Sequence, residues 1–150
     1  MNEIVPIGVY IAKIKLMQER IFTSILKEYG INDFNSPQSR ILFTLWTEDN
    51  ITISELSKRT ALAKTTLTSM LDRLESQGLI NRLYSPDDRR SVKITVSDKT
   101  KSLEHHYEKA RLAMKDINFK GFSPEEIDDL IQKLIRVLNN LHEYSENHIK

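Results

Sequence analysis

The chain has 150 residues, 39% of them apolar, and a formal net charge of +1, which predicts one compact domain with its own core. The absence of cysteine excludes disulfide bonds, a cysteine-ligated zinc site and a thiol redox sensor, and favours a cytoplasmic location. No stretch approaches the roughly 20 apolar residues of a membrane-spanning helix, so we expect no membrane partner.

Three amphipathic helices are predicted in the first part of the chain. Apolar residues at three- and four-residue spacing indicate a helix over residues 5–30, whose apolar opening lacks the basic start of a signal peptide. A second helix starts with Ser36 as its N-cap and Pro37 in its first position. A third follows from a capping box formed by Thr52 and Glu55.

A fourth helix is predicted over residues 64–77, after a short break, and Gly78 ends it. Because so few residues separate the third and fourth helices, the two form a helix-turn-helix. Residues 79–84 can then pair with residues 92–96, where apolar and polar side chains alternate as in a half-buried strand. Residues 85–91 are the hairpin tip between the two strands. A helix-turn-helix followed directly by a hairpin is the winged-helix arrangement.

Two more helices are predicted after the hairpin, from about residue 98 to 117 and from 124 to 144. The predicted fold class is mainly α with a small β-hairpin wing. One domain of residues 1–150 would contain a winged helix-turn-helix core over 36–97, flanked by dimerisation helices over 5–30 and 98–147. The first and last helices carry more apolar surface than a small winged helix can cover, which favours a homodimer over a self-contained helical core.

Basic residues gather in the middle of the chain. Between Ser57 and Lys93 there are eight basic and four acidic residues, so the excess of positive charge lies in the predicted winged helix. A locally basic surface can face a polyanion even when the whole chain is nearly neutral. Charged faces are most often simply solvated, so this signal is weak by itself.

The fourth helix has an outward face of short polar side chains. Opposite its apolar stripe lie Thr65, Ser69, Asp72 and Ser76. Such side chains, near a helix N-terminus whose N–H groups favour phosphate, suit a helix that enters the major groove. The alternative is that the serines and threonines only cap and solubilise the helix.

The hairpin tip places two aspartates beside two arginines. An arginine at the end of a thin wing can enter the minor groove, where it responds to groove width and negative potential. Asp88, two residues before Arg90, is expected to hold that guanidinium through a charge-assisted hydrogen bond. The alternative is an ordinary surface ion pair, which contributes roughly 0 to 1 kcal/mol.

A resemblance to a known family is carried by the stretch LSKRTALAKTTLTSMLDRLESQGLINRLYSPDDRRSVKITVSDKT, which is similar to the DNA-binding core of the MarR (multiple antibiotic resistance regulator) family. That family shows a wing signature of Asp-x-Arg, an apolar strand pair and a Leu-Thr ending. Here Asp88 and Arg90 match the acid and the arginine, and Ile94 and Val96 match the strand pair. Ser97 stands where the family has threonine.

The resemblance implies a set of DNA-binding residues. On the major-groove side these are Thr65, Thr66, Thr68, Ser69 and Arg73. In the minor groove Arg90 is supported by Asp88, and the implied phosphate contacts are Lys64, Arg82, Arg89 and Lys93. Three positions depart from the family pattern: Ala63 replaces a capping serine, Ser69 a common basic residue, and Thr100 a glycine.

The resemblance also implies a homodimer that binds pseudo-palindromic promoter DNA, usually as a repressor. Many members of the family release DNA when a small, often aromatic, molecule binds between the dimerisation region and the winged helix. For this chain we therefore expect three partners. They are double-stranded promoter DNA, a second copy of the chain and a small-molecule effector. The effector's binding residues remain unassigned, and no cofactor is expected.

Other functional classes find little support in the sequence. His105 and His106 point about 100° apart on a helix, and the other histidines supply no obvious metal site. The sequence has no glycine-rich phosphate loop, nucleophile elbow or His-Glu-x-x-His motif, so we do not expect an enzyme. The open alternative is a winged-helix protein-interaction module without specific DNA binding.

Overall fold

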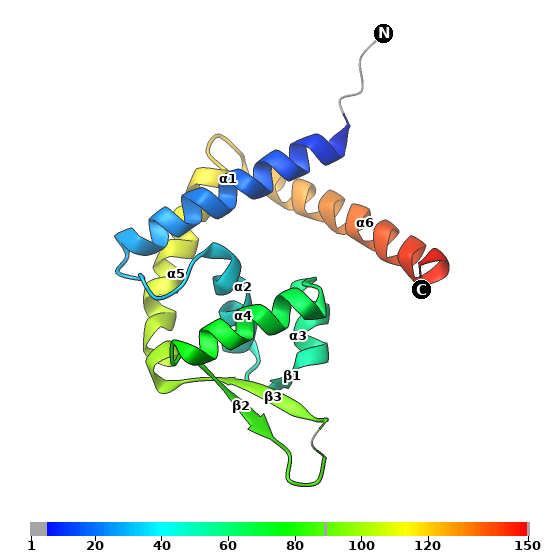
Figure 1. The fold of residues 1–150 in the computed structure, drawn as a ribbon. Coiled ribbons are helices and arrows are strands. Elements are labelled where there is room, and N and C mark those ends of the chain that lie inside the picture. Colours follow the sequence, from blue (N-terminus) through cyan, green and yellow to red (C-terminus); the bar gives the residue numbers. More distant parts are fainter. Residues whose placement is uncertain (1–5, 89, 150) are drawn as a thin grey trace. The chain divides into compact units, whose positions relative to one another are not determined.

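The computed structural model describes residues 6–88 and 90–149 (Figure 1). The described elements are α1 Ile7–Glu28, α2 Ser36–Thr47, β1 Ile51–Thr52, α3 Ile53–Thr60, α4 Lys64–Ser76, β2 Ile80–Tyr84, β3 Val92–Val96, α5 Asp98–Asn118 and α6 Pro124–His148. This confirms the predicted class, mainly helical with a small β wing. The chain divides into two compact units, one up to Met114 and one from Lys115.

The core of the first unit lies where α2, α3 and α4 meet the sheet and the second half of α1. Its largest fully buried side chains are Leu26, Ile31, Ile41, Leu42, Leu45, Leu56, Leu67, Leu71, Leu74, Leu79, Ile80 and Ile94. Leucine predominates because it combines good helix propensity with a large apolar area. This core fixes α4 in place and leaves the β2–β3 hairpin projecting beyond the helices (Figure 1).

The sheet has three antiparallel strands in the order β1-β3-β2, one strand more than the predicted hairpin. Residues Ile51 and Thr52 of β1 pair with Ile94 and Lys93. Just before β1, the Asp49 carboxylate accepts hydrogen bonds from the Thr95 hydroxyl at 2.8 Å and the Val96 N–H at 3.0 Å. A strand of two residues shows no alternation, so the sequence pattern could not indicate it.

Two predicted caps were wrong in detail. The N-cap of α2 is Asn35 and not Ser36, and Asn35 forms a reciprocal capping box with Gln38. At α3 the Thr52 hydroxyl accepts from the Glu55 N–H at 3.2 Å as expected. The Glu55 carboxylate does not complete the box, because it pairs with Arg59 at 2.8 Å, where a charged donor makes the stronger hydrogen bond.

The second unit contains the last residues of α5 and the whole of α6. A capping box of Ser123 and Glu126 begins α6, which runs four residues further than predicted, to His148. No residue of α6 is buried, although leucine and isoleucine form a stripe along it. Within the described residues no helix is long and apolar enough to cross a membrane.

Candidate nucleic-acid interface

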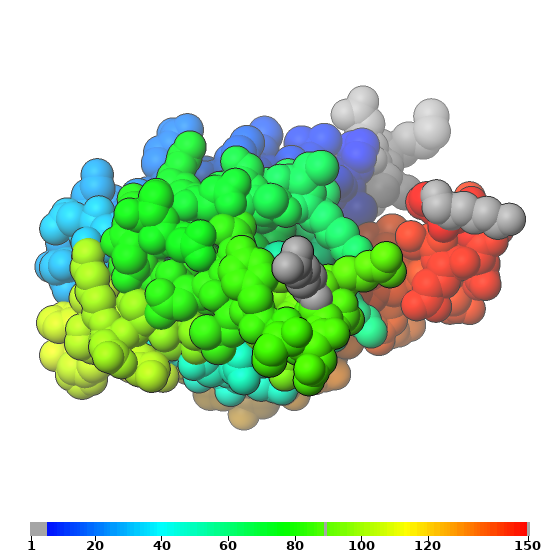
Figure 2. Space-filling view, turned by 60° about the horizontal axis from the view of Figure 1, so that its bottom comes forward, coloured from blue at the N-terminus to red at the C-terminus, as the bar shows by residue number. Residues whose placement is uncertain are grey.

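Helix α4 presents one apolar and one polar face. Leu67, Leu71 and Leu74 are completely buried, which anchors the helix in the core. The side chains on the other face, among them Thr65 and Ser69, are exposed. Figure 2 shows α4 and the hairpin on one face of the first unit. A helix held from behind in this way presents its outer side chains as a surface to a partner.

The first turn of α4 keeps free hydrogen-bonding groups. Its N-cap residue, Ala63, has no side-chain oxygen, so no side chain caps the N–H groups of that turn. Thr68 donates its hydroxyl to the Lys64 carbonyl at 2.8 Å. Among the described residues, the hydroxyls of Thr65, Thr66 and Ser69 have no hydrogen-bond partner. Free N–H groups, free hydroxyls and the positive end of the helix dipole together favour an anion.

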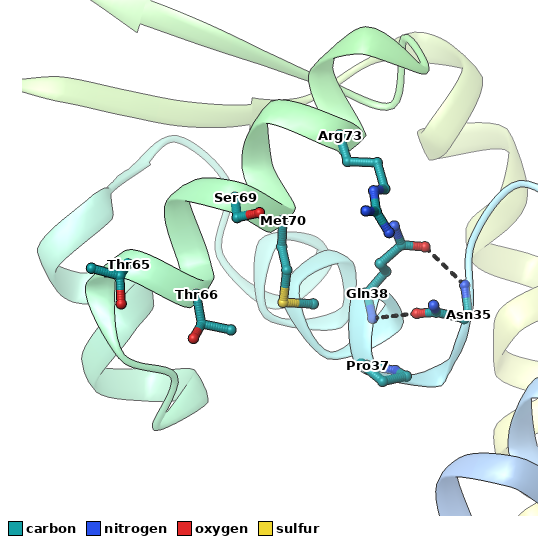
Figure 3. Close-up of a pocket in the computed structure, with 8 residues that line it drawn as sticks. All are labelled: Asn35, Pro37, Gln38, Thr65, Thr66, Ser69, Met70 and Arg73. Atoms are coloured by element: carbon teal, nitrogen blue, oxygen red, sulfur yellow. Dashed lines mark hydrogen bonds between the residues drawn. The ribbon is translucent and has the colours of Figure 1, made fainter.

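A cleft of about 530 Å³ runs between this surface and the start of α2 (Figure 3). Its lining residues are Asn35, Pro37, Gln38, Thr65, Thr66, Ser69, Met70 and Arg73. Asn35, Pro37 and Gln38, at the start of α2, were not predicted as part of the site, because they lie about 30 residues before α4 and only the fold brings them together. The Asn35–Gln38 capping box uses the side-chain oxygens of both residues, and Arg73 is the cation among the residues that line the cleft.

Asp88 in the wing has a different role from the one predicted. Its Oδ1 accepts a hydrogen bond from the backbone N–H of Arg90 at 2.9 Å, and its carbonyl accepts one from Ser91 at 3.1 Å. In the described part of the chain, no ion pair joins the Asp88 carboxylate to the Arg90 guanidinium. A short aspartate side chain reaches the N–H two residues ahead more easily than a long flexible guanidinium. Asp88 therefore shapes the turn and leaves the arginine side chain free.

The predicted cations fall into two groups. Lys64, Arg73, Arg90 and Lys93 are exposed, and within the described residues they form no ion pair. Arg89, also predicted as a phosphate contact, lies outside the described residues. Unpaired and exposed cations are available to a polyanion without first breaking a contact within the protein.

Arg82 belongs to the other group. Its guanidinium contacts Asp72 at 2.7 Å and Glu75 at 2.9 Å, and its side chain is only 11% exposed. Burial of the guanidinium acts to lower the pKa of Arg82, but the hydrogen bonds to both carboxylates outweigh it and the pKa is raised. Because two acidic partners already neutralise this charge, the arrangement favours a contact within the protein over the phosphate contact expected from sequence.

A smaller hollow of about 270 Å³ lies between the start of α3 and the turn that joins the two wing strands. Thr52, the N-cap residue before α3, and Ser54 of α3 line one side of it, and Asp88 and Arg90 line it from the wing. In the part of the chain that the structure describes, no three His, Cys, Asp or Glu side chains gather as they would around a metal ion. Hydroxyl groups and an arginine line both hollows, and the smaller one also contains the Asp88 carboxylate.

The chain is similar in sequence to known transcription regulators. A family model described as the MarR family matches residues 34–92. The organic hydroperoxide resistance transcriptional regulator of Bacillus subtilis is 33% identical over 114 residues, which cover 71% of each chain. The HTH-type transcriptional regulator YfiV of Bacillus subtilis, named as uncharacterised, is 32% identical over 95 residues. That match covers 63% of this chain and 59% of YfiV.

Similarity in structure extends over most of the chain. A crystal structure of a MarR mutant from E. coli complexed with operator DNA superposes with a TM-score of 0.79 and 28% sequence identity. The match covers 91% of this chain and 96% of the E. coli chain.

The uncapped start of α4 yields a stability prediction. Ala63 already has an extended backbone conformation suited to an N-cap, so Ala63→Ser should stabilise the protein by about 0.5 to 2 kcal/mol. Urea unfolding of the two proteins measures this difference. Ala61→Ser is the matched control, because Ala61 has a φ of 57° and lies outside the cap position. An equal gain in both variants would contradict the capping explanation.

Proposed function

The chain belongs to the MarR family, and from this premise we propose that it is a homodimeric repressor which binds pseudo-palindromic promoter DNA and releases it to a small-molecule ligand. Members of this family are DNA-binding transcription regulators and not enzymes. The observation that carries the proposal is the similarity to a MarR protein complexed with operator DNA. A repressor must reach the chromosomal DNA in the cytoplasm, which agrees with the location expected from the sequence.

In the proposed complex α4 lies in the major groove with its N-terminus first. The free hydroxyls of Thr65, Thr66 and Ser69 and the side chain of Arg73 would contact base edges and nearby phosphates. Thr68, whose hydroxyl hydrogen is already donated within the helix, can still accept a hydrogen bond. The exposed Lys64 at the helix start would pair with a phosphate.

The wing would follow the DNA backbone into the adjacent minor groove. Arg90 is exposed and its backbone is held by Asp88, so its side chain starts from an ordered position. A guanidinium in a narrow minor groove responds to the negative potential there. Lys93 and Arg89 would contact phosphates along the wing.

A second copy of the chain would cover apolar surface that this chain leaves exposed. The α6 stripe consists of the exposed residues Leu130, Ile131, Leu134, Ile135, Leu138, Leu141 and Tyr144. The first half of α1 also exposes large apolar side chains, among them Ile7, Ile11 and Ile14. Exposed apolar stripes of this kind are typical of an interface, and twofold symmetry would place two recognition helices on successive half-sites about 34 to 36 Å apart.

Effector relief is supported by an aromatic cluster shared by α1, α2 and α5. The Tyr107 ring lies 5.0 Å from Trp46, 5.7 Å from Phe22 and 5.8 Å from Phe43, measured between ring centroids. Among the described residues the buried Trp46 Nε1–H has no hydrogen-bond partner. Burial raises the pKa of the Tyr107 hydroxyl. An aromatic ligand could stack on these rings and accept the free hydrogen bond.

Promoter binding is the decisive test. In fluorescence anisotropy at near-physiological salt, we expect the protein to prefer the promoter fragment of its own gene over a shuffled duplex by about 10³-fold or more. The logarithm of affinity should fall with the logarithm of salt concentration with a slope of about −0.9 per neutralised phosphate. Equal and weak binding to several candidate promoters and to shuffled DNA, with a flat salt response, would favour the protein-interaction module instead.

Replacing the wing arginine should separate DNA binding from dimerisation. We expect Arg90→Ala to lower promoter affinity by roughly 5- to 150-fold, because a minor-groove charge contact is lost. Sedimentation of the same preparation should show an unchanged oligomeric state. Lys109→Ala on α5 removes an equal charge outside the proposed interface and should bind as the wild type does. Undiminished affinity of Arg90→Ala would contradict the role of the wing.

The dimer is tested on the α6 stripe. Leu134→Asp combined with Leu138→Asp should give a monomer in sedimentation, because burying two carboxylates in an apolar interface carries a large desolvation cost. Promoter affinity should fall with it, since one subunit reaches only one half-site. Gln132→Asp with Asn139→Asp adds the same charges on the polar face of α6 and should remain dimeric. A dimer that survives the leucine replacements would exclude the stripe as the interface.

A further inference from the structure

Two acidic residues lie on the helix that would face DNA. Asp72 and Glu75 are exposed on α4, and an uncompensated carboxylate there would repel phosphates. A neighbouring cation would offset this repulsion by neutralising the two carboxylates. The guanidinium of Arg82, on the first strand of the wing, contacts both of them.

The three side chains form a fork across two elements. Arg82 Nη2 contacts Asp72 Oδ1 at 2.7 Å and Nη1 contacts Glu75 Oε1 at 2.9 Å. Asp72 and Glu75 are three residues apart, so both carboxylates lie on one side of the helix within reach of a planar guanidinium. A lysine ammonium has no such pair of diverging donors. The Arg82 side chain is only 11% exposed, whereas the Asp72 and Glu75 side chains are 66% and 43% exposed, so solvent reaches the contacts from the acidic side.

The position of Arg82 in the sheet explains its low exposure. Arg82 lies directly opposite Ile94, which is fully buried, so its side chain leaves from the core-facing side of β2. The backbone joins α4 to β2 through a short turn in which Gly78 has a φ of 73°. The Arg82 fork therefore adds a polar link between α4 and β2 to the turn and to the core packing that already join them.

We propose that Arg82 is a positioning residue of the DNA interface, which clamps α4 to the wing through Asp72 and Glu75. The clamp holds the two elements at one angle, so that the α4 side chains and Arg90 meet adjacent grooves of the duplex together. Ordering them before binding removes an entropy cost from complex formation. This role rests on the proposed function, because an ordered angle matters here only for a partner that contacts both elements.

Replacing Asp72 and Glu75 distinguishes the clamp from a purely electrostatic effect of the two carboxylates on DNA binding. Asp72→Ala with Glu75→Ala makes the interface more positive, so a purely electrostatic account expects tighter binding to every duplex. If the clamp exists, the result should be the opposite: the ratio of the protein's affinity for the promoter to its affinity for a shuffled duplex should fall by about tenfold or more.

A matched control keeps the change in charge but spares the clamp. Glu104→Ala with Glu108→Ala on α5 removes two carboxylates and breaks one arginine–carboxylate pair, since Glu108 contacts Arg111 at 2.6 and 2.9 Å. This control should keep the wild-type preference. An unchanged or increased preference in the Asp72 and Glu75 variant would overturn the clamp.

Hydrogen exchange tests the clamp without DNA. In free Arg82→Ala, amides of residues 80–84 and 92–96 should exchange faster than in the wild type, whereas those of α2 stay protected. Arg82→Lys should restore only part of the protection, and Arg111→Ala should change nothing in the wing. Wild-type exchange in Arg82→Ala would overturn the clamp. A wild-type protein that ignores its promoter would instead contradict the proposed function, while the exchange rates still decide whether the clamp exists.

Discussion

The burial of one face of α4 is the constraint on which the remaining features depend. Leu67, Leu71 and Leu74 are fully buried and fix both the position and the rotation of this helix. Each such side chain contributes about 1.5 to 3 kcal/mol of burial free energy, so a rotated helix would lose several kcal/mol. The polar face is thus held outward by the core behind it. Its free hydroxyls and N–H groups can be used by a partner because they are not needed for the stability of the fold.

Local sequence signals predicted the six described helices and the two wing strands, because caps and periodicity act over a few residues. They missed what depends on distant pairing. The strand β1 forms only because β3, some 40 residues later, offers it an edge. In the same way, Gln38 joins the cleft at α4 through the fold alone. The candidate site was predictable as a helix face and a wing, whereas its second wall was not.

Asp88 and Arg82 both contact groups within the protein that the sequence did not indicate. The predicted roles of Asp88 and Arg82 rest on their charge and their position in the family pattern. The sequence does not show which of several possible groups each side chain contacts. Asp88 found a backbone N–H two residues away, and Arg82 found two carboxylates on α4. Pairing of this kind divides the cations into those used within the protein and those left for a partner. The low net charge of the chain therefore says little about the charge of the interface.

The apolar face of α6, in the second unit, is not buried by the part of the chain that the structure describes. None of its described residues is buried, yet α6 is 25 residues long and amphipathic. Isolated helices are marginally stable in water, so most of the stability of such a helix must come from packing of its apolar face. In the proposed dimer the partner supplies that packing, and the order of α6 becomes coupled to association. Stability would then depend on protein concentration, and the distance between the two recognition helices would be set by the elements that hold the dimer together.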